Sequence, residues 1–416
     1  MLGLLILTTI VFLIFLGNSV IKRKWVASTL LFGVYTFSLL FGIVRCMSGN
    51  GYMGLSIFGT ITFCFLIYLM INPFCIRKPE FVFNQNDKHF NKRFTRVGYA
   101  IGGILSLGNF LILPIIVLVS ATVGLDTIRN SMYNGEYVFA DAVGRTEQIG
   151  MYIMWGLHYL SYTSLALFFF AITFVEGKKL MKFLLIWGSL LTIFQGMIVA
   201  GRTNMTYWLF FALFLTCVFS SYWKKETKRF FVLFSSVLIV AFASYFLAVS
   251  GDRFEDYEGG TEGGLVEYIG QPFQNYCEFF DKFDYNHFTL RRLFPLTSTL
   301  FYGELDLGEY RYEIEQLTSS HMFIGVFYTL LGDLIVDIGR IGMIVYVLIY
   351  NFVAGMVTRK RKMTVSDFLP ICLLYQIPLF GLFYYSFWRY QASAYFIITF
   401  LVAWYLKPNK RKYERS

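Results

Sequence analysis

Residues Met1–Val20 read MLGLLILTTIVFLIFLGNSV, and the basic triplet Lys22-Arg23-Lys24 comes one residue later. An apolar run of about twenty residues is long enough to cross the hydrocarbon core of a bilayer as a helix. A secretory signal carries its basic residues ahead of the apolar run, whereas here they follow it. Because lysine and arginine accumulate on the cytoplasmic side, we expect a retained membrane anchor whose N-terminus lies outside.

The whole chain has the composition of a membrane protein. Of its 416 residues, 56% are hydrophobic, 20% are aromatic and 15% are charged, whereas a soluble domain carries about a quarter charged residues. The net charge of +10 lies mostly in short clusters between apolar runs, which is typical of topology signals and argues against nucleic acid as a partner. We therefore predict an all-α polytopic membrane protein that forms one integral membrane domain over residues 1–416.

About eleven segments have the length and apolar character of transmembrane helices. The predicted spans are residues 2–20, 25–44, 55–75, 97–123, 151–174, 183–200, 205–222, 230–250, 339–357, 364–384 and 392–406. When these spans alternate in direction, 25 of the 36 lysine and arginine residues fall in segments assigned to the cytoplasm. This agreement with the positive-inside rule predicts an N-terminus outside and a C-terminus in the cytoplasm.

The two basic residue types divide differently between the two sides. Of the 17 lysines, 16 lie on the predicted cytoplasmic side, whereas ten of the 19 arginines lie on the predicted outer side. Topology does not require arginine there, but the planar guanidinium binds phosphate through paired hydrogen bonds. Pairing with the many outer acidic residues explains any single arginine about as well. As a set, the outer arginines are candidates for binding a phosphorylated ligand.

A long predicted extracytoplasmic loop covers residues 251–321. It holds 14 acidic, 5 basic and 15 aromatic residues, and aromatic faces combined with carboxylates suit a sugar ligand. A loop that packs on the rim of the membrane would have a similar composition. Apolar side chains recur at helical spacing from Leu265 to Phe283, so we expect an interfacial helix on the outer leaflet or over a cavity, kinked at Pro272.

The stretch Met322–Thr358 is mostly apolar but too long for one crossing. As a straight helix it would measure about 55 Å, against about 30 Å for the hydrocarbon core. Residues 322–338 must therefore protrude, re-enter the membrane or line a cavity. The stretch contains Asp333, Asp337 and Arg340, and charged residues at such a depth usually face a polar cavity and mark function.

Six arginines and one histidine are candidate site residues. Arg202 lies in the short turn Gly201–Asn204, where it can hold an anionic headgroup or reach ordinary lipid phosphate. His321 can accept a proton from a hydroxyl near neutral pH, or it can be a plain loop residue. The further candidates for binding a diphosphate, each with ion pairing or interfacial anchoring as the alternative, are Arg291, Arg292, Arg340, Arg129 and Arg389.

No cofactor or metal is expected. The sequence has no Walker loop, no glycine motif for a dinucleotide and no cysteine or histidine spacing for zinc. Any chemistry would therefore be driven by an activated substrate. Only Cys46 and Cys277 fall in segments predicted to lie outside, and both a disulfide and two free thiols are consistent with that placement.

In its architecture and in two short patches, the chain resembles the Wzy-type O-antigen and oligosaccharide repeat unit polymerases. One patch is the Gly201-Arg202 turn, and the other is His321 leading into Gly339-Arg340-Ile341-Gly342. The related O-antigen ligases share a similar arrangement of histidine followed by glycines. The resemblance implies a GT-C-like, metal-independent glycosyltransferase in the bacterial cytoplasmic membrane.

Members of this family join undecaprenyl-diphosphate-linked repeat units on the outer face of that membrane and so build a surface polysaccharide. By this resemblance, Arg202 and His321 would be the catalytic residues, and Arg202 together with the other five arginines would bind diphosphate. The partners would be a lipid-linked oligosaccharide donor and acceptor, membrane lipids and a chain-length regulator. The alternatives are a ligase-type transferase and a non-enzymatic flippase or transporter of lipid-linked oligosaccharide.

Overall fold

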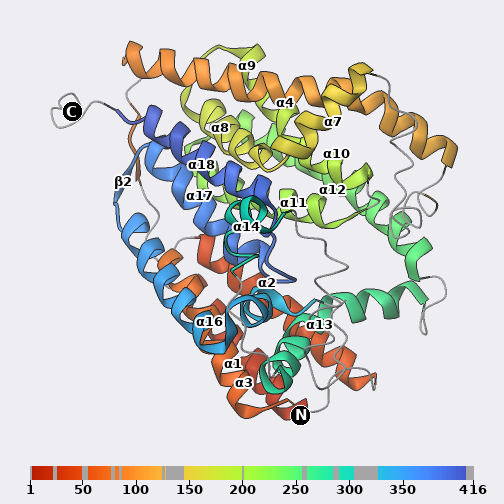
Figure 1. The fold of residues 1–416 in the computed structure, drawn as a ribbon. Coiled ribbons are helices and arrows are strands. Elements are labelled where there is room, and N and C mark those ends of the chain that lie inside the picture. Colours follow the sequence, from red (N-terminus) through yellow and green to blue (C-terminus); the bar gives the residue numbers. More distant parts are fainter. Residues whose placement is uncertain are drawn as a thin grey trace. The chain divides into compact units, whose positions relative to one another are not determined.

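The computed structural model describes residues 2–21, 26–48, 55–75, 80–83, 87–123, 127, 145–198, 201–254, 260–283, 290–303 and 327–408. This part of the chain is helical apart from one pair of two-residue strands (Figure 1). Its first elements are α1 (Leu2–Ile21), α2 (Val26–Met47), α3 (Ile57–Ile71), η1 (Asn72–Phe74), β1 (Glu80–Phe81), α4 (Lys88–Val123), α7 (Arg145–Leu157), α8 (Leu160–Phe174) and α9 (Lys179–Ser189). The later ones are α10 (Leu191–Ile198), α11 (Thr203–Phe219), η2 (Ser220–Tyr222), α12 (Lys225–Phe254), α13 (Gly260–Lys282), α14 (Pro295–Tyr302), α16 (Thr329–Thr358), β2 (Lys362–Met363), α17 (Val365–Phe380) and α18 (Tyr390–Tyr405).

The helices confirm a multi-pass membrane protein. Among the described residues, seven helices are long and apolar enough to cross a bilayer. They are Leu2–Ile21, Ala27–Met47, Ile57–Phe74, Lys88–Val123, Lys179–Ile198, Thr203–Tyr222 and Thr329–Thr358. An eighth span is added if the bent pair α7 and α8 crosses as one unit. The segments predicted near 230–250, 364–384 and 392–406 are also largely helical, as α12, α17 and α18, and the count of eleven stays a prediction.

The segment predicted as one span over 151–174 is broken. Ile149–Leu157 and Leu160–Phe174 meet at an angle of 78°, and the backbone amide of Ser161 donates to the carbonyl oxygen of His158 at 3.1 Å, which tightens the turn. His158 is buried there, with its Nδ1 3.2 Å from the carbonyl oxygen of Trp155. The histidine is therefore part of a packed bend.

The chain divides into two compact units. The first consists of Met1–Pro79, Glu258–Arg361 and Ile371–Phe396, and the second consists of Glu80–Tyr257, Lys362–Pro370 and Ile397–Ser416. In the second unit β1 pairs in parallel with β2, with Glu80 opposite Lys362 and Phe81 opposite Met363. The Phe81 ring stacks on Phe219. The short sheet thereby ties two segments predicted to be cytoplasmic to an aromatic core.

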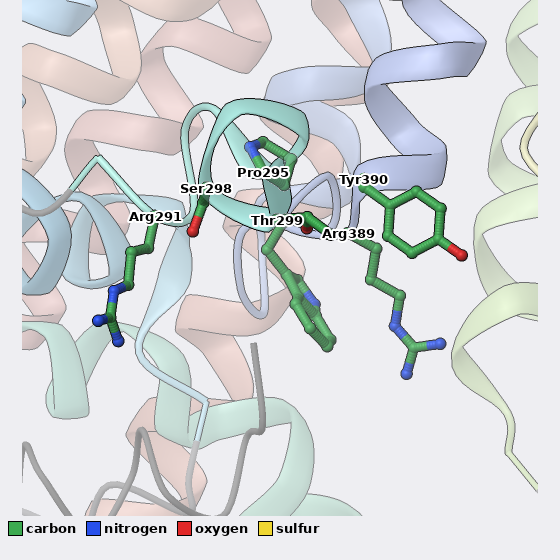
Figure 2. Close-up of a pocket in the computed structure, with 7 residues that line it drawn as sticks. Arg291, Pro295, Ser298, Thr299, Arg389 and Tyr390 are labelled. Carbon is green, nitrogen blue, oxygen red and sulfur yellow. The ribbon is translucent and has the colours of Figure 1, made fainter. Parts of the chain in front are cut away.

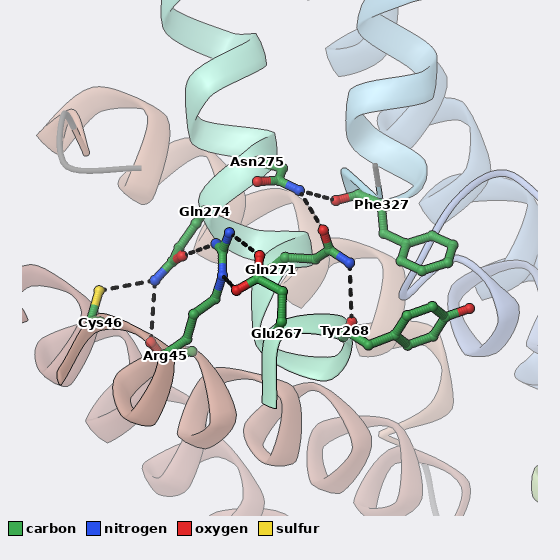
Figure 3. Close-up of polar contacts among 9 residues, drawn as sticks. Arg45, Cys46, Glu267, Tyr268, Gln271, Gln274, Asn275 and Phe327 are labelled. Carbon is green, nitrogen blue, oxygen red and sulfur yellow. Dashed lines mark hydrogen bonds and ion pairs between the residues drawn. The ribbon is translucent and has the colours of Figure 1, made fainter. Parts of the chain in front are cut away.

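In the first unit, α13 packs against α2, α3 and α16, and a polar network joins it to α2 (Figure 3). Arg45 donates from Nε to Glu267 Oε2 at 2.6 Å and also bonds to Gln274. Gln274 in turn donates to the carbonyl oxygen of Gly42 at 3.2 Å and lies 3.0 Å from Cys46 Sγ. Both Cys46 and Cys277 are free thiols.

The helix predicted from Leu265 to Phe283 is confirmed as α13, and it packs against α2, α3 and α16. Phe273, Tyr276 and Phe280 are buried as the spacing predicts. The polar side chains of Gln274 and Asn275 are buried as well, because both find hydrogen-bond partners. Those of Gln274 lie on α2, whereas Asn275 donates to Gln271 in the same helix and to the carbonyl oxygen of Phe327. The helix is embedded among its neighbours over residues 270–277.

Candidate functional site

A break divides α16 into two segments at Gly339, whose φ of 72° and ψ of 173° lie in a region that is essentially open to glycine alone. The ten residues before it, Thr329–Ile338, are all buried, and we call them the half-helix. The nineteen residues after the break, 340–358, have a helical length of about 28 Å. That length suffices for one crossing. The half-helix therefore belongs to the part of Met322–Thr358 that exceeds one crossing, as the length of that stretch predicts.

The half-helix carries two buried carboxylates. Asp333 is 1% exposed and Asp337 is 0% exposed. Asp333 forms an ion pair with Arg292, whose side chain is 8% exposed. Asp337 Oδ2 accepts a hydrogen bond from the backbone amide of Leu293 at 3.0 Å. Both acids therefore fasten the segment just before α14, as buried charges require a partner.

The connection between α17 and α18 is fastened to the start of the same half-helix. The amide of Thr329 donates to the carbonyl oxygen of Phe383 at 2.9 Å, and that of Leu330 donates to the carbonyl oxygen of Gly381 at 2.8 Å. In the opposite direction, the amide of Tyr385 donates to Asp333 Oδ2. These bonds satisfy amides at a helix N-terminus that have no partner within the helix.

A partly open pocket lies between these two fastened segments (Figure 2). It is lined by Arg291, Pro295, Ser298, Thr299, Trp388, Arg389 and Tyr390, and we call it the arginine pocket. One wall is α14 with Arg291, which lies four residues before its first residue Pro295. The other wall is the beginning of α18 with the two residues before it. All seven residues belong to the first unit.

The lining combines two cations, two hydroxyls and two aromatic rings. In Figure 2 the side chains of Arg291 and Arg389 flank α14 and extend in the same direction. The guanidinium carbon of Arg389 lies 4.8 Å from the centre of the Trp388 ring, a distance at which a cation and an aromatic face attract each other. Guanidinium and hydroxyl donors are the groups that bind phosphate oxygens, and aromatic faces stack on sugars.

Arg340 follows the break directly and contacts the C-terminal end of α13. Its Nε donates to the carbonyl oxygen of Phe280 at 2.7 Å and its Nη2 to that of Asp281 at 3.3 Å. The guanidinium also lies over the Phe280 ring, 5.5 Å from its centre. Such carbonyls lack partners within a helix and favour a cation. The guanidinium of Arg340 thus binds the end of α13.

Arg202 belongs to the second unit, where it is the N-cap residue of α11 and is buried. Its carbonyl oxygen accepts from the amide of Thr206 at 3.0 Å. The hairpin before it is closed by a hydrogen bond of 2.8 Å from the amide of Gly201 to the carbonyl oxygen of Gly196. The predicted short turn between two apolar helices is confirmed, and Arg202 lies within it.

Two of the predicted site residues, His321 and Arg129, lie outside the described residues. Of the other five, four belong to the first unit: Arg291 and Arg389 line one pocket, Arg292 is paired next to it, and Arg340 lies beyond the half-helix. The fifth, Arg202, belongs to the second unit.

Ser298, Thr299 and Tyr390 are not among the residues that the sequence predicts for this site. The Tyr384–Tyr390 cluster has the composition of an interfacial anchor, and nothing in its pattern shows that α14 lies opposite. A proline at the first position of α14 does signal the start of a helix, and that signal could have placed Ser298 and Thr299 in its first turns.

Among the described residues, no group of three or more histidine, cysteine, aspartate and glutamate side chains is arranged to hold a metal ion. Comparison of the chain with protein-family models, with curated proteins and with solved structures finds no match.

Proposed function

We propose that this chain is a polymerase of undecaprenyl-diphosphate-linked oligosaccharide repeat units, acting on the outer face of a bacterial cytoplasmic membrane. The observation that carries the proposal is the arginine pocket, in which Arg291 and Arg389 approach hydroxyl and aromatic side chains. Both arginines fall in segments that the distribution of lysine and arginine assigns to the outer side or its membrane face. A lipid diphosphate sugar presents the matching groups, which are phosphate oxygens beside a pyranose ring.

The proposed reaction needs no nucleotide, because the diphosphate activates the donor sugar. The hydroxyl oxygen of the acceptor sugar attacks the anomeric carbon of the donor, and the bond from that carbon to the diphosphate oxygen breaks. The proton of the hydroxyl passes to His321 or to a carboxylate. Arg291 and Arg389 neutralise the charge that grows on the leaving diphosphate. For Arg202, which belongs to the second unit, the family resemblance implies a catalytic role.

The proposal includes a GT-C-like architecture of about eleven spans, with the N-terminus outside and the C-terminus in the cytoplasm. Donor and acceptor are both lipid-linked, so both reach the protein from the bilayer. A chain-length regulator is the additional protein partner in this scheme. The product is a surface polysaccharide such as an O-antigen, a capsule or an exopolysaccharide.

Reconstitution tests the proposal directly. The purified protein in liposomes receives its native undecaprenyl-diphosphate-linked repeat unit, and the products are separated by length. A ladder of lengths is expected from a polymerase, whereas a single transfer product would indicate a ligase-type transferase. No product, in an assay where a polymerase of known activity makes its own ladder, would reject both enzymatic functions.

One observation favours a second candidate function, the transport of lipid-linked oligosaccharide. The break at Gly339 and the two buried carboxylates of the half-helix resemble the interrupted helices with which transporters bind substrates inside the membrane. The same liposomes distinguish the two functions. Movement of a labelled lipid-linked unit between leaflets without any new glycosidic bond would support transport and reject polymerisation.

A further inference from the structure

Asp333 contacts two residues that lie close in sequence to the two walls of the arginine pocket, Arg292 and Tyr385. Its ion pair with Arg292 holds the residue next to Arg291, which lines one wall. Its Oδ2 accepts the amide of Tyr385, three residues before Trp388 and four before Arg389 on the other wall. One carboxylate thus connects two segments that are far apart in the sequence and that meet only in the fold.

We infer that Asp333 is a positioning residue, which fixes the separation of Arg291 and Arg389 without touching the ligand. The identity of that ligand as a lipid-linked diphosphate rests on the proposed function. Two guanidiniums can hold one diphosphate only when their spacing matches its oxygens. A residue that sets the spacing therefore controls affinity, even though it is almost fully buried.

The surroundings of Asp333 restrict how the walls can move. Asp337 holds the amide of Leu293, so the first wall is attached to the half-helix at two successive turns. The carbonyl oxygens of Gly381 and Phe383 bind the amides at the start of the half-helix, so the second wall is also attached twice or more. The side chain of Asp333 takes part in both attachments.

A buried ion pair can also serve stability alone, and the two roles have different consequences. Loss of a purely stabilising pair lowers the melting temperature and leaves the geometry of the folded pocket unchanged. Loss of a positioning pair changes the separation of the walls in protein that is still folded. The test must therefore measure the separation itself and use a variant that keeps the fold.

Arg292→Met/Asp333→Leu is that variant, because replacing both partners of a buried pair by apolar residues avoids an isolated buried charge. Asp333→Asn alone removes one charge of the pair while Arg292 stays charged, and it serves as the more severe case. The matched control is Arg45→Met/Glu267→Leu, which removes another arginine–carboxylate pair of the same unit on elements, α2 and α13, that do not line the pocket.

Spin labels at Leu300→Cys on α14 and Tyr390→Cys on α18, with the native cysteines replaced, report the separation of the walls by electron paramagnetic resonance. We expect a narrow distance distribution in the parent and in the control pair, and a shifted or broadened one in Arg292→Met/Asp333→Leu. In the polymerisation assay without labels, the same double variant should raise KM for the lipid-linked unit about tenfold, with a smaller change in kcat.

An unchanged distance distribution in the folded double variant would overturn the inference. The distance measurement needs no substrate, so it decides the role of Asp333 even if no ladder forms. A missing ladder in the parent protein counts against the proposed function and not against the positioning role. If the control pair broadens the distribution as much, the effect is a general loosening of the unit, and the inference fails.

Discussion

Gly42 and Gly270 face each other where α2 and α13 cross. A Cβ atom on Gly270 would lie 2.7 Å from the carbonyl oxygen of Phe41, and one on Gly42 would lie 3.1 Å from the carbonyl oxygen of Gly270. Distances of this kind leave no room for a methyl group unless the backbones separate. The crossing also brings Arg45 close enough to bind Glu267, so the close approach and the polar network depend on each other.

We predict that Gly270→Ala destabilises the first unit by about 1–3 kcal/mol, because the added methyl group forces the two backbones apart. The thermal unfolding of the purified protein in detergent measures the effect. Gly33→Ala on α2 is the control, since a Cβ there meets no atom within 4 Å. Equal melting temperatures for the two variants would show that the crossing tolerates a side chain.

Gly339→Ala should cost about 1–3 kcal/mol, because alanine is strained at the positive φ of the break. The strain should also move the half-helix, so polymerisation should fall more than the loss of stability explains. Gly355→Ala lies on the same α16, in open space and with ordinary helical geometry. That control should be neutral or slightly stabilising. A Gly339→Ala variant with full activity would mean that the break is dispensable.

Arg389→Ala should lower the rate of polymerisation about 100-fold, since it removes one of the two cations of the pocket. Arg389→Lys should restore little, because lysine keeps the charge but loses the planar pair of donors. Lys282→Ala, which removes an exposed cation paired with Glu278 on the same unit, is the comparison and should keep its rate. Equal losses of rate in Arg389→Ala and Lys282→Ala would indicate that the net charge of the protein matters, and that Arg389 does not bind the substrate directly.

Arg202→Ala should abolish ladder formation while the protein still inserts into the membrane. Arg202→Lys should also be poor, as expected for a bidentate phosphate contact. Because Arg202 is buried at the start of α11, its loss could also destabilise the fold. The thermal unfolding of the Arg202 variants is therefore compared with that of Thr216→Ala, a control variant near the other end of the same helix. Full activity in the alanine variant would exclude Arg202 from the site.

Alkaline pH should weaken the packing of α13. Burial raises the pKa of the Cys277 thiol and that of the Tyr276 hydroxyl above their ordinary values of 9.0 and 10.0. Groups with a raised pKa in the folded state contribute stability below the unfolded-state pKa, and this contribution is lost as the pH rises above it. The melting temperature should therefore fall from about pH 9 upward, and less steeply in Tyr276→Phe/Cys277→Ala. Parallel curves for the two proteins would contradict this prediction.

Much of the secondary structure is predictable from local features of the sequence. Apolar length and lysine clusters identify helices such as α1 and α11, because the bilayer requires long apolar segments whatever the neighbouring helices are. The excess length of Met322–Thr358 likewise predicts an extra segment beyond one crossing. The break at Gly339 agrees with the predicted start of the span at residue 339, but the positive φ of Gly339 does not follow from length or apolar character.

The arginine pocket is harder to predict from local features of the sequence. Arg291 and Arg389 could be selected by residue type, but their common pocket depends on how the half-helix holds two distant segments. The pairing of Arg292 with Asp333 is a tertiary contact with no sequence periodicity. The burial of Gln274 and Asn275 could not be predicted from the sequence either, since a polar side chain in a loop helix ordinarily faces water.

The parallel pairing of β1 with β2 has a consequence for how this protein can change. The exposed Glu80 and Lys362 alternate with the more buried Phe81 and Met363, so a one-residue insertion in either strand would turn an apolar side chain outward. Backbone amides and carbonyls hold the strands together whatever the outer side chains are. Related sequences should therefore vary freely at the exposed positions 80 and 362, while the lengths of β1 and β2 stay constant. A reporter protein should for the same reason not be inserted into either strand.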